Sequence, residues 1–440
     1  MGQTHRGRGL LVIVAVVVLA GCAGFLPGDS TEREVPEELG EVDGVSYDDK
    51  LEVDPEEGFT EEELDEFVKR TMARIEVVRQ LEFDRPVDVD LFTREEYRDW
   101  RANRSTSRTE AEWENQIWRS LFLIGQDTNA TAELDEAFGG AVQGFYQPGQ
   151  DQIVIVSDSE SPTINKATLI HELVHALQEQ QFGLEFGHES RDEQAAYDTV
   201  VEGEADLVPR LYLEEWCEQW SCLRPELATE GGTGGDATLD LGIYLMLTQP
   251  YTQGTQFVEG VKSEGGWEAV NELHENPPRS TAQTIYPERS TEFVPENISI
   301  TDQSSGDWER FDHEPVGDTL GVASLYSMFA ANDIVEIEEP IEYAHPVVEG
   351  WQGDRIVPYR SAGEFGYVWE LSWESEDDAE QFAEAYRELL DSHGGLARGS
   401  TSYVIPDGPF AGAYRLTVED DGVLIVNGPD LDSLTGIHER

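Results

Sequence analysis

The most restrictive feature of this chain is a pair of histidines inside an apolar run at residues 168–177, which read TLIHELVHAL. Positions four apart lie on one face of a helix, so His171 and His175 would project side by side, with Glu172 next to them. The six other residues from 169 to 177 are all uncharged, although 91 of the 440 residues are Asp or Glu. The run therefore predicts a buried helix that carries polar chemistry. A core helix with two hydrogen-bonded histidines is the competing interpretation.

Two imidazoles at this spacing suit a zinc ion. Zinc lowers the pKa of a water bound to it to about 7, and a carboxylate beside the open coordination position can take the proton. We therefore predict Zn²⁺ as the cofactor, His171 and His175 as metal ligands, and Glu172 as the catalytic base.

A third ligand is expected downstream, where residues 199–208 read TVVEGEADLV. Glu202 and Asp206 are four apart and share a helix face, whereas Glu204 points elsewhere. Glu202 can reach the metal, while Asp206 can accept the N–H of a ligand histidine and thereby fix its tautomer. The apolar neighbours indicate a partly buried helix, in which unpaired carboxylates are costly.

Other ligand sets are less consistent with the sequence. The metzincin pattern requires Gly and His after the second histidine, but those places hold Gln178 and Gln181. His188 stays an alternative ligand, although it lies in a polar Gly-His-Glu-Ser segment. Because acidic residues are abundant in this chain, ordinary surface carboxylates are the alternative interpretation of Glu202 and Asp206.

The runs HELVHALQEQQF and VVEGEAD resemble the core of the gluzincin metallopeptidases. More narrowly, roughly residues 140–290 are similar to HExxH cell-surface lipoproteins of haloarchaea and some bacteria. The resemblance implies a zincin-like domain, mainly helical with a small edge-strand sheet, that hydrolyses peptide bonds in peptide or protein substrates by zinc-activated water. A catalytically inactive surface protein that keeps the zincin fold for binding or as a scaffold is the alternative.

Two further segments bear on substrate binding. Residues 144–148 and 152–156 predict a hairpin before the zinc helix, and Gly144, Phe145 and Tyr146 would form an edge strand along which a peptide can pair. An ordinary sheet strand is the alternative. The similar lipoproteins often have a histidine where this chain has Tyr286. Tyr286, or else His274 or Arg289, is the candidate to donate a hydrogen bond to the oxyanion of the reaction, and a core or surface role is the favoured alternative for each.

The composition indicates a folded protein with a halophilic surface. The formal net charge is −62, from 29 Lys and Arg against 91 Asp and Glu, and only four residues are lysine. Such a charge is screened in molar salt, where the Debye length is about 3 Å, so stability should depend on salt. The charge is spread along the whole chain and argues against a nucleic-acid partner.

The N-terminus predicts export and lipid anchoring. Basic residues precede an apolar run at 10–20, which is too short to span a membrane comfortably, and Leu19-Ala20-Gly21-Cys22 forms a lipobox. We predict a signal peptide at 1–22, lipidation of Cys22, and attachment to the extracellular face of the cell membrane. A plain signal peptide is the alternative. Residues 23–58, rich in Gly, Pro, Glu and Asp, would form a flexible tether.

The remaining cysteines and the sequons are typical of an exported protein. Cys217 and Cys222 are close enough in sequence to close a small disulfide loop, and zinc binding by this pair is the alternative. Sequons at Asn103, Asn129 and Asn297 permit glycosylation.

The overall class is predicted as α+β, with a zinc domain at 59–295 and a smaller C-terminal α+β domain at 296–440. Capping boxes at Thr60 and Thr93 mark helix starts in the first domain. In the second, we predict a strand at 366–373, a helix from Ser375 to Leu390 and two strands between 414 and 426. No catalytic motif is evident there.

Overall fold

The structure is a computed structural model of the chain. It describes residues 39–50, 60–102, 107–148, 150, 152–157, 166–184, 188–216, 240–289, 293–338 and 340–439. The predicted signal peptide, the lipidation site Cys22, the Cys217–Cys222 pair and the sequon at Asn103 lie outside these residues.

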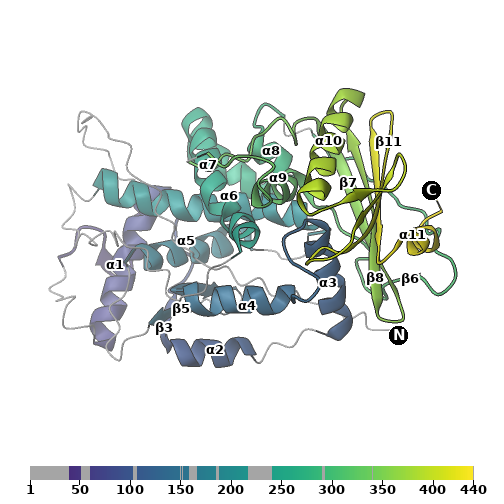
Figure 1. Ribbon diagram of the computed structural model, residues 1–440. Helices are drawn as coiled ribbons and strands as arrows, with labels where there is room; N and C mark the ends of the chain where they lie inside the picture. Colours follow the sequence, from purple (N-terminus) through teal and green to yellow (C-terminus); the bar gives the residue numbers. More distant parts are fainter. Residues whose placement is uncertain are drawn as a thin grey trace, which may run out of the picture.

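The chain forms a mixed α/β structure, with a helical part on one side and a large C-terminal sheet on the other (Figure 1). Among the described residues, no helix combines the length and the apolar character that crossing a membrane requires. The helices of the helical part are α1 (Glu61–Arg79), α2 (Arg94–Ala102), α3 (Arg108–Ser120), α4 (Ala130–Ala141), α5 (Lys166–Phe182), α6 (Arg191–Leu211), α7 (Leu241–Glu275), α8 (Thr281–Ile285) and α9 (Gly321–Ala331), and a π-helical turn, η1 (Tyr212–Trp216), follows α6.

Local sequence signals mark several helix starts as predicted. Thr60 caps α1, and a complete capping box joins it to Glu63. The backbone N–H of Glu96 donates to the Thr93 hydroxyl, and the Glu96 carboxylate accepts from the Thr93 backbone in return. Both predicted capping boxes are therefore confirmed.

The helical part contains a three-stranded sheet in the order β3-β5-β4, formed by β3 (Asp88–Thr93), β4 (Gly144–Gln147) and β5 (Gln152–Ser157). β3 runs parallel to β5, whereas β4 pairs antiparallel with β5 as the predicted hairpin and lies at the edge. Side chains alternate between the two faces. Tyr146 and Ile153 pack in the core beside α5, while Phe145 and Val154 pack with Tyr97 of α2. The sheet thus brings β4 next to the helix that carries the histidines.

Part of the predicted tether is folded. Residues 41–46 form a two-stranded hairpin, β1 (Glu41–Val42) and β2 (Val45–Ser46), that packs on α1. The Val42 side chain is buried, and the backbone N–H of Gly40 donates to the Glu76 carboxylate of α1. The folded part therefore begins before residue 59, because this acidic segment still supplies a buried valine and a turn.

The C-terminal sheet is antiparallel throughout and larger than the sequence indicated. Its order is β6-β7-β8-β12-β11-β10-β9. Helix α10 (Glu376–Ser392), capped by Ser375 as predicted, covers one face together with α3 and α9, and α11 (Leu431–Ile437) covers the other (Figure 1). The strands are β6 (Glu309–Arg310), β7 (Trp351–Ser361), β8 (Glu364–Trp373), β9 (Leu396–Ala397), β10 (Ser402–Ile405), β11 (Gly412–Glu419) and β12 (Gly422–Gly428).

The sheet and the helical part share one core, which crosses the domain boundary expected at residue 296. Trp118 of α3, Phe329 of α9 and Trp369 of β8 belong to the same buried cluster. The buried carboxylate of Asp354 accepts hydrogen bonds from the backbone N–H groups of Leu320 and Gly321 at 2.9 Å each. It also accepts the indole N–H groups of Trp351 and Trp369. The start of α9 is thus fixed directly to the sheet.

Helices α6 and α7 cross with their backbones in contact at two glycines. A Cβ on Gly203 would overlap the backbone of Gly254, and a Cβ on Gly254 would overlap the carbonyl oxygen of Thr199. Neither position has room for a side chain. This close crossing sets the distance between the ligand helix α6 and the residues of α7 one turn from Gly254.

We predict that Gly254→Ala destabilises the protein by about 1–3 kcal/mol, because the added methyl group overpacks the crossing. The matched control is Gly260→Ala on the same helix, where a Cβ would meet nothing within 4 Å. There alanine should be neutral or add up to about 1 kcal/mol through its helix propensity. Denaturant unfolding of both variants at one salt concentration measures the difference. Equal stability of the two variants would contradict the tight crossing.

Candidate metal centre

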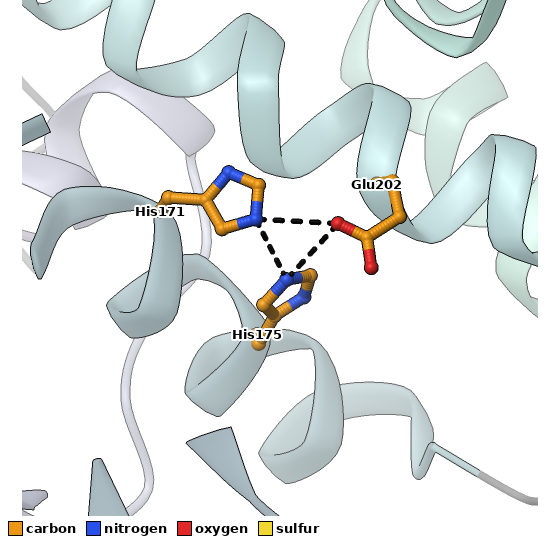
Figure 2. Close-up of side chains that lie close together, drawn as sticks. All are labelled: His171, His175 and Glu202. Carbon is orange, nitrogen blue, oxygen red and sulfur yellow. Dashed lines mark hydrogen bonds and ion pairs between the residues drawn. The ribbon is translucent and has the colours of Figure 1, made fainter. Parts of the chain in front are cut away.

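Two neighbouring helices bring the three predicted ligands together. His171 and His175 lie one turn apart on α5, and Glu202 faces them from α6 (Figure 2). The two Nε2 atoms are 3.0 Å apart, and Glu202 Oε2 lies 3.2 Å from His171 Nε2 and 3.4 Å from His175 Nε2. All three residues are buried, with exposed fractions of 5% or less. The group therefore has the composition and compactness to hold a metal ion.

The hydrogen bonds on the far side of each imidazole decide where its lone pair points. His171 Nδ1 lies 2.9 Å from Asp206 Oδ1, and an ionised carboxylate only accepts, so Nδ1 carries the hydrogen. His175 Nδ1 lies 2.9 Å from the side-chain oxygen of Gln178, which also only accepts. In the neutral imidazoles both Nε2 atoms therefore present lone pairs to Glu202. The partner role predicted for Asp206 matches this placement.

Three acceptor atoms thus face one another with no donor between them. Such an arrangement is repulsive unless a cation or added protons occupy the centre. Bonds of about 2.0–2.1 Å at tetrahedral angles would place two ligand atoms about 3.3 Å apart. The three observed separations of 3.0, 3.2 and 3.4 Å fit this spacing. The residues present therefore fit a small tetrahedral cation such as zinc.

The electrostatics of the group also favour positive charge. Burial raises the pKa of Glu202, but the two histidines outweigh it and hold the pKa at about 2. Burial lowers the pKa of His171, but Asp206 and Glu202 outweigh it and hold that pKa well above its usual range. The carboxylates are therefore arranged to stabilise a cationic centre.

Glu172 is the residue best placed to act on a proton beside this group. It is fully buried, and neither carboxylate oxygen has a partner at normal hydrogen-bond geometry among the described residues. Burial raises its pKa to about 7, although His171 and His175 oppose the rise. The Tyr146 backbone also lowers this pKa, but no Lys or Arg among the described residues neutralises the carboxylate. A buried carboxylate without a cationic partner costs free energy, which favours a chemical role over a structural one.

The edge strand β4 lies directly against the Glu172 side chain. A Cβ on Gly144 would come within 2.8 Å of Thr168 Cγ2 and 3.4 Å of Glu172 Cγ, so glycine permits this approach. Val156 N–H donates to Gln143 C=O, and hydrogen-bonded pairs alternate along an antiparallel ladder. The backbone groups of Gly144 and Tyr146 consequently point away from β5. The predicted substrate strand thus lies beside Glu172, the predicted base.

Tyr251 of α7 is a site residue that the sequence reasoning missed. Its ring stacks on His171 with centroids 6.3 Å apart. Burial and the nearby carboxylates, Glu202 and Asp206 foremost, raise its pKa well above 10. It lies one turn before Gly254, so the α6–α7 crossing brings it to the centre. The sequence held no local signal for this role, because the contact depends on how two distant helices pack.

The predicted oxyanion donors lie elsewhere. The Tyr286 hydroxyl donates to the backbone C=O of His345 and accepts from its N–H, both at 3.1 Å, within the core shared with the C-terminal sheet. His274 pairs with Glu204, and Arg289 donates to the backbone C=O of Trp351. His188 packs against Tyr197 and is not in the ligand group. Tyr286 thus belongs to a different buried cluster from the α5 residues that flank the histidines, and its hydroxyl is bonded to the His345 backbone.

We predict that the purified chain binds one divalent zinc ion and that Glu202→Ala and His175→Ala each abolish stoichiometric binding. Each substitution removes one of the three ligands, and the two ligands that remain are too few to hold the ion. His188→Ala should keep full stoichiometry, because that imidazole lies outside the group. Metal analysis after dialysis gives the answer. Retention of one zinc by Glu202→Ala would remove this glutamate from the ligand set.

Comparison with known proteins adds one match. The sequence model of a domain of unknown function, DUF8575, matches residues 309–438. This segment contains α9 and the C-terminal sheet and none of the residues of the metal group. No curated protein matches the chain. No solved structure matches it either.

Proposed function

We propose that this protein is a zinc-dependent peptidase with a gluzincin-like site on a zincin-like helical domain. One observation carries the proposal: three buried acceptor atoms converge beside the buried carboxylate of Glu172, which forms no ion pair with Lys or Arg among the described residues. His171, His175 and Glu202 would hold the zinc. Zinc bound there supplies Lewis-acid chemistry, which polarises an oxygen ligand and makes it easier to deprotonate.

Glu172 acts as the general base and then as the proton donor. Its carboxyl group can take up a proton because neither oxygen accepts a hydrogen bond of normal geometry from the described residues, although the Tyr146 backbone lies near it. A pKa raised by burial to about 7 lets the same carboxyl group accept and return a proton near neutral pH. The proton taken from the attacking water passes to the leaving amine, so the group ends in its starting state.

Tyr251 takes the role first assigned to Tyr286. Its raised pKa keeps the hydroxyl protonated, so it can donate to the carbonyl oxygen that gains negative charge. The stack on His171 holds the ring beside the metal group. A hydrogen bond from this hydroxyl is stronger to the developing oxyanion than to the neutral carbonyl oxygen, and such a difference is what transition-state stabilisation requires.

The peptide substrate would lie along β4. The backbone groups of Gly144 point away from β5 and can pair with an extended peptide, which places a scissile bond beside Glu172. The pairing uses backbone groups alone, so it accepts many sequences. This contact does not distinguish peptide substrates from protein substrates.

The cellular setting of the proposal comes from the sequence. A lipid attached at Cys22 would anchor the enzyme at the extracellular face of the membrane, and the acidic surface suits high salt. Its substrates would then be extracellular peptides or proteins, and nucleic acid is not among the partners.

The proposed activity is tested with a peptide library in molar salt, with and without a chelator. Cleavage that the chelator stops and added zinc restores is expected. Stoichiometric zinc binding without any cleavage would instead identify a surface binding protein that keeps the zincin site.

We predict that Glu172→Gln lowers kcat on any cleaved peptide by at least about 100-fold, in the range of lost general acid–base catalysis. Zinc stoichiometry should not change, because no ligand is removed. Glu179→Gln, on the same helix but outside the metal group, is the matched control and should keep full activity. Turnover by Glu172→Gln equal to the control would exclude this residue as the base.

We predict that Tyr251→Phe lowers kcat by about 100- to 1000-fold, as expected for loss of one donor to a developing oxyanion. KM and zinc content should change little, since the ring and its stack on His171 persist. Tyr244→Phe, two turns earlier on α7, serves as the control. A change confined to KM would indicate that Tyr251 binds substrate and does not stabilise the transition state.

A further inference from the structure

The two histidines of the metal group are held by different kinds of partner. His171 donates to the carboxylate of Asp206, whereas His175 donates to the neutral amide of Gln178. Gln178 lies three residues after His175 on the same helix and is 1% exposed. An amide can present either its oxygen or its NH₂ group to an imidazole, so something must decide which one faces His175.

Groups on helix α6 determine which end of the Gln178 amide faces His175. The NH₂ group of Gln178 donates to the backbone C=O of Val201 at 2.9 Å and to Glu204 Oε2 at 3.1 Å. Both partners only accept. Rotating the amide by half a turn would set its oxygen against two acceptors in a buried environment, which is strongly unfavourable. The amide oxygen must therefore face His175 Nδ1, and His175 must carry its hydrogen there.

Glu204 is in turn held by side chains from two other helices. Its Oε1 pairs with Arg79 of α1, and its Oε2 pairs with His274 of α7. All three side chains are at most 1% exposed. Arg79 also donates to Asn271 at 2.7 Å and lies over the Trp267 ring at 4.5 Å. The carboxylate consequently has one orientation, with Oε2 directed at both His274 and Gln178.

We propose that Gln178 and Glu204 are positioning residues for the metal ligand His175. Glu204, held by Arg79 and His274, sets the Gln178 amide, and this amide fixes the tautomer and ring plane that direct His175 Nε2 at the metal. The inference rests on the proposed metal centre and assigns to it a buried chain of contacts from α1 and α7. Asp206 does the same for His171 in a single step.

A merely structural ion-pair cluster would give a different result. Arg79, Glu204 and His274 join α1, α6 and α7, so their loss lowers stability in either case. Only the positioning role couples Glu204 to metal affinity, and it does so only while Gln178 is present. Metal affinity, measured separately from unfolding, therefore separates the two roles.

The experiment uses the full chain freed of metal and titrated with Zn²⁺ in competition with a chelator. The variants are Gln178→Leu, Glu204→Gln and the double variant. Gln180→Leu is the matched control, since Gln180 lies on the same helix and bonds to the backbone of Arg85. Titration with Co²⁺, followed by its visible absorption, reports the ligand geometry. Thermal unfolding of each metal-free variant reports stability.

We expect Gln178→Leu to weaken zinc binding about 10- to 100-fold, the range for loss of a partner that orients a metal-ligating histidine. The Co²⁺ spectrum should change, and Gln180→Leu should bind like the original chain. Glu204→Gln should weaken binding less, and it should cause no further loss when Gln178 is already leucine. This lack of additivity is the signature of one chain of contacts.

The proposal would be overturned if Gln178→Leu and Gln180→Leu bound zinc with equal affinity. This comparison does not depend on whether Glu204→Gln folds. Additive losses in the double variant would also overturn it, because Glu204 would then act by a separate route. Failure of the original chain to bind zinc at all would reject the proposed metal centre itself.

Discussion

The structure depends on the way helix α6 packs between α5 and α7. From one side, α6 supplies the ligand Glu202 and the carboxylate that holds His171, and it holds His175 through Gln178. On the other side, its backbone touches α7 at Gly203 and Gly254, which leaves no slack in the spacing. Glu202, Glu204 and Asp206 lie within four residues of one another on α6, so a small rotation of this helix would misplace all three carboxylates together.

The same packing buries groups that an ordinary hydrophobic core would exclude. Buried acceptors that face one another cost free energy, and so does a buried carboxylate without a cationic partner. The chain tolerates both in one place, although its 91 acidic residues could have been kept at the surface. Any cation that binds the folded form alone repays the cost by mass action. In the metal-free site the facing acceptor atoms repel one another, and a bound divalent ion would remove this repulsion.

The sequence predicts those parts of the site that follow from helix periodicity. His171 and His175 on one helix, with Glu202 and Asp206 on another, have spacings that force shared faces. Gln178 could have been found in the same way, as the residue one turn after His175. Tyr251 could not, since its position follows from the glycine crossing and not from any local pattern. Likewise, the seven-stranded order of the C-terminal sheet depends on pairings distant in sequence, and the long strand β7 was not predicted.

The C-terminal sheet, which carries no metal ligand, still contributes to the geometry of the site through the first turn of α6. The backbone N–H of Asp192 donates to Thr319 C=O, and that of Arg191 donates to Asp318. The Asp192 carboxylate accepts from Thr281 of α8. Asp318 pairs with Ile356 of β7, so α6 begins on a segment bound to the sheet. The segment matched by the domain of unknown function therefore fixes one end of α6, the helix that carries the predicted ligand Glu202, and it is expected to work only as part of the whole chain.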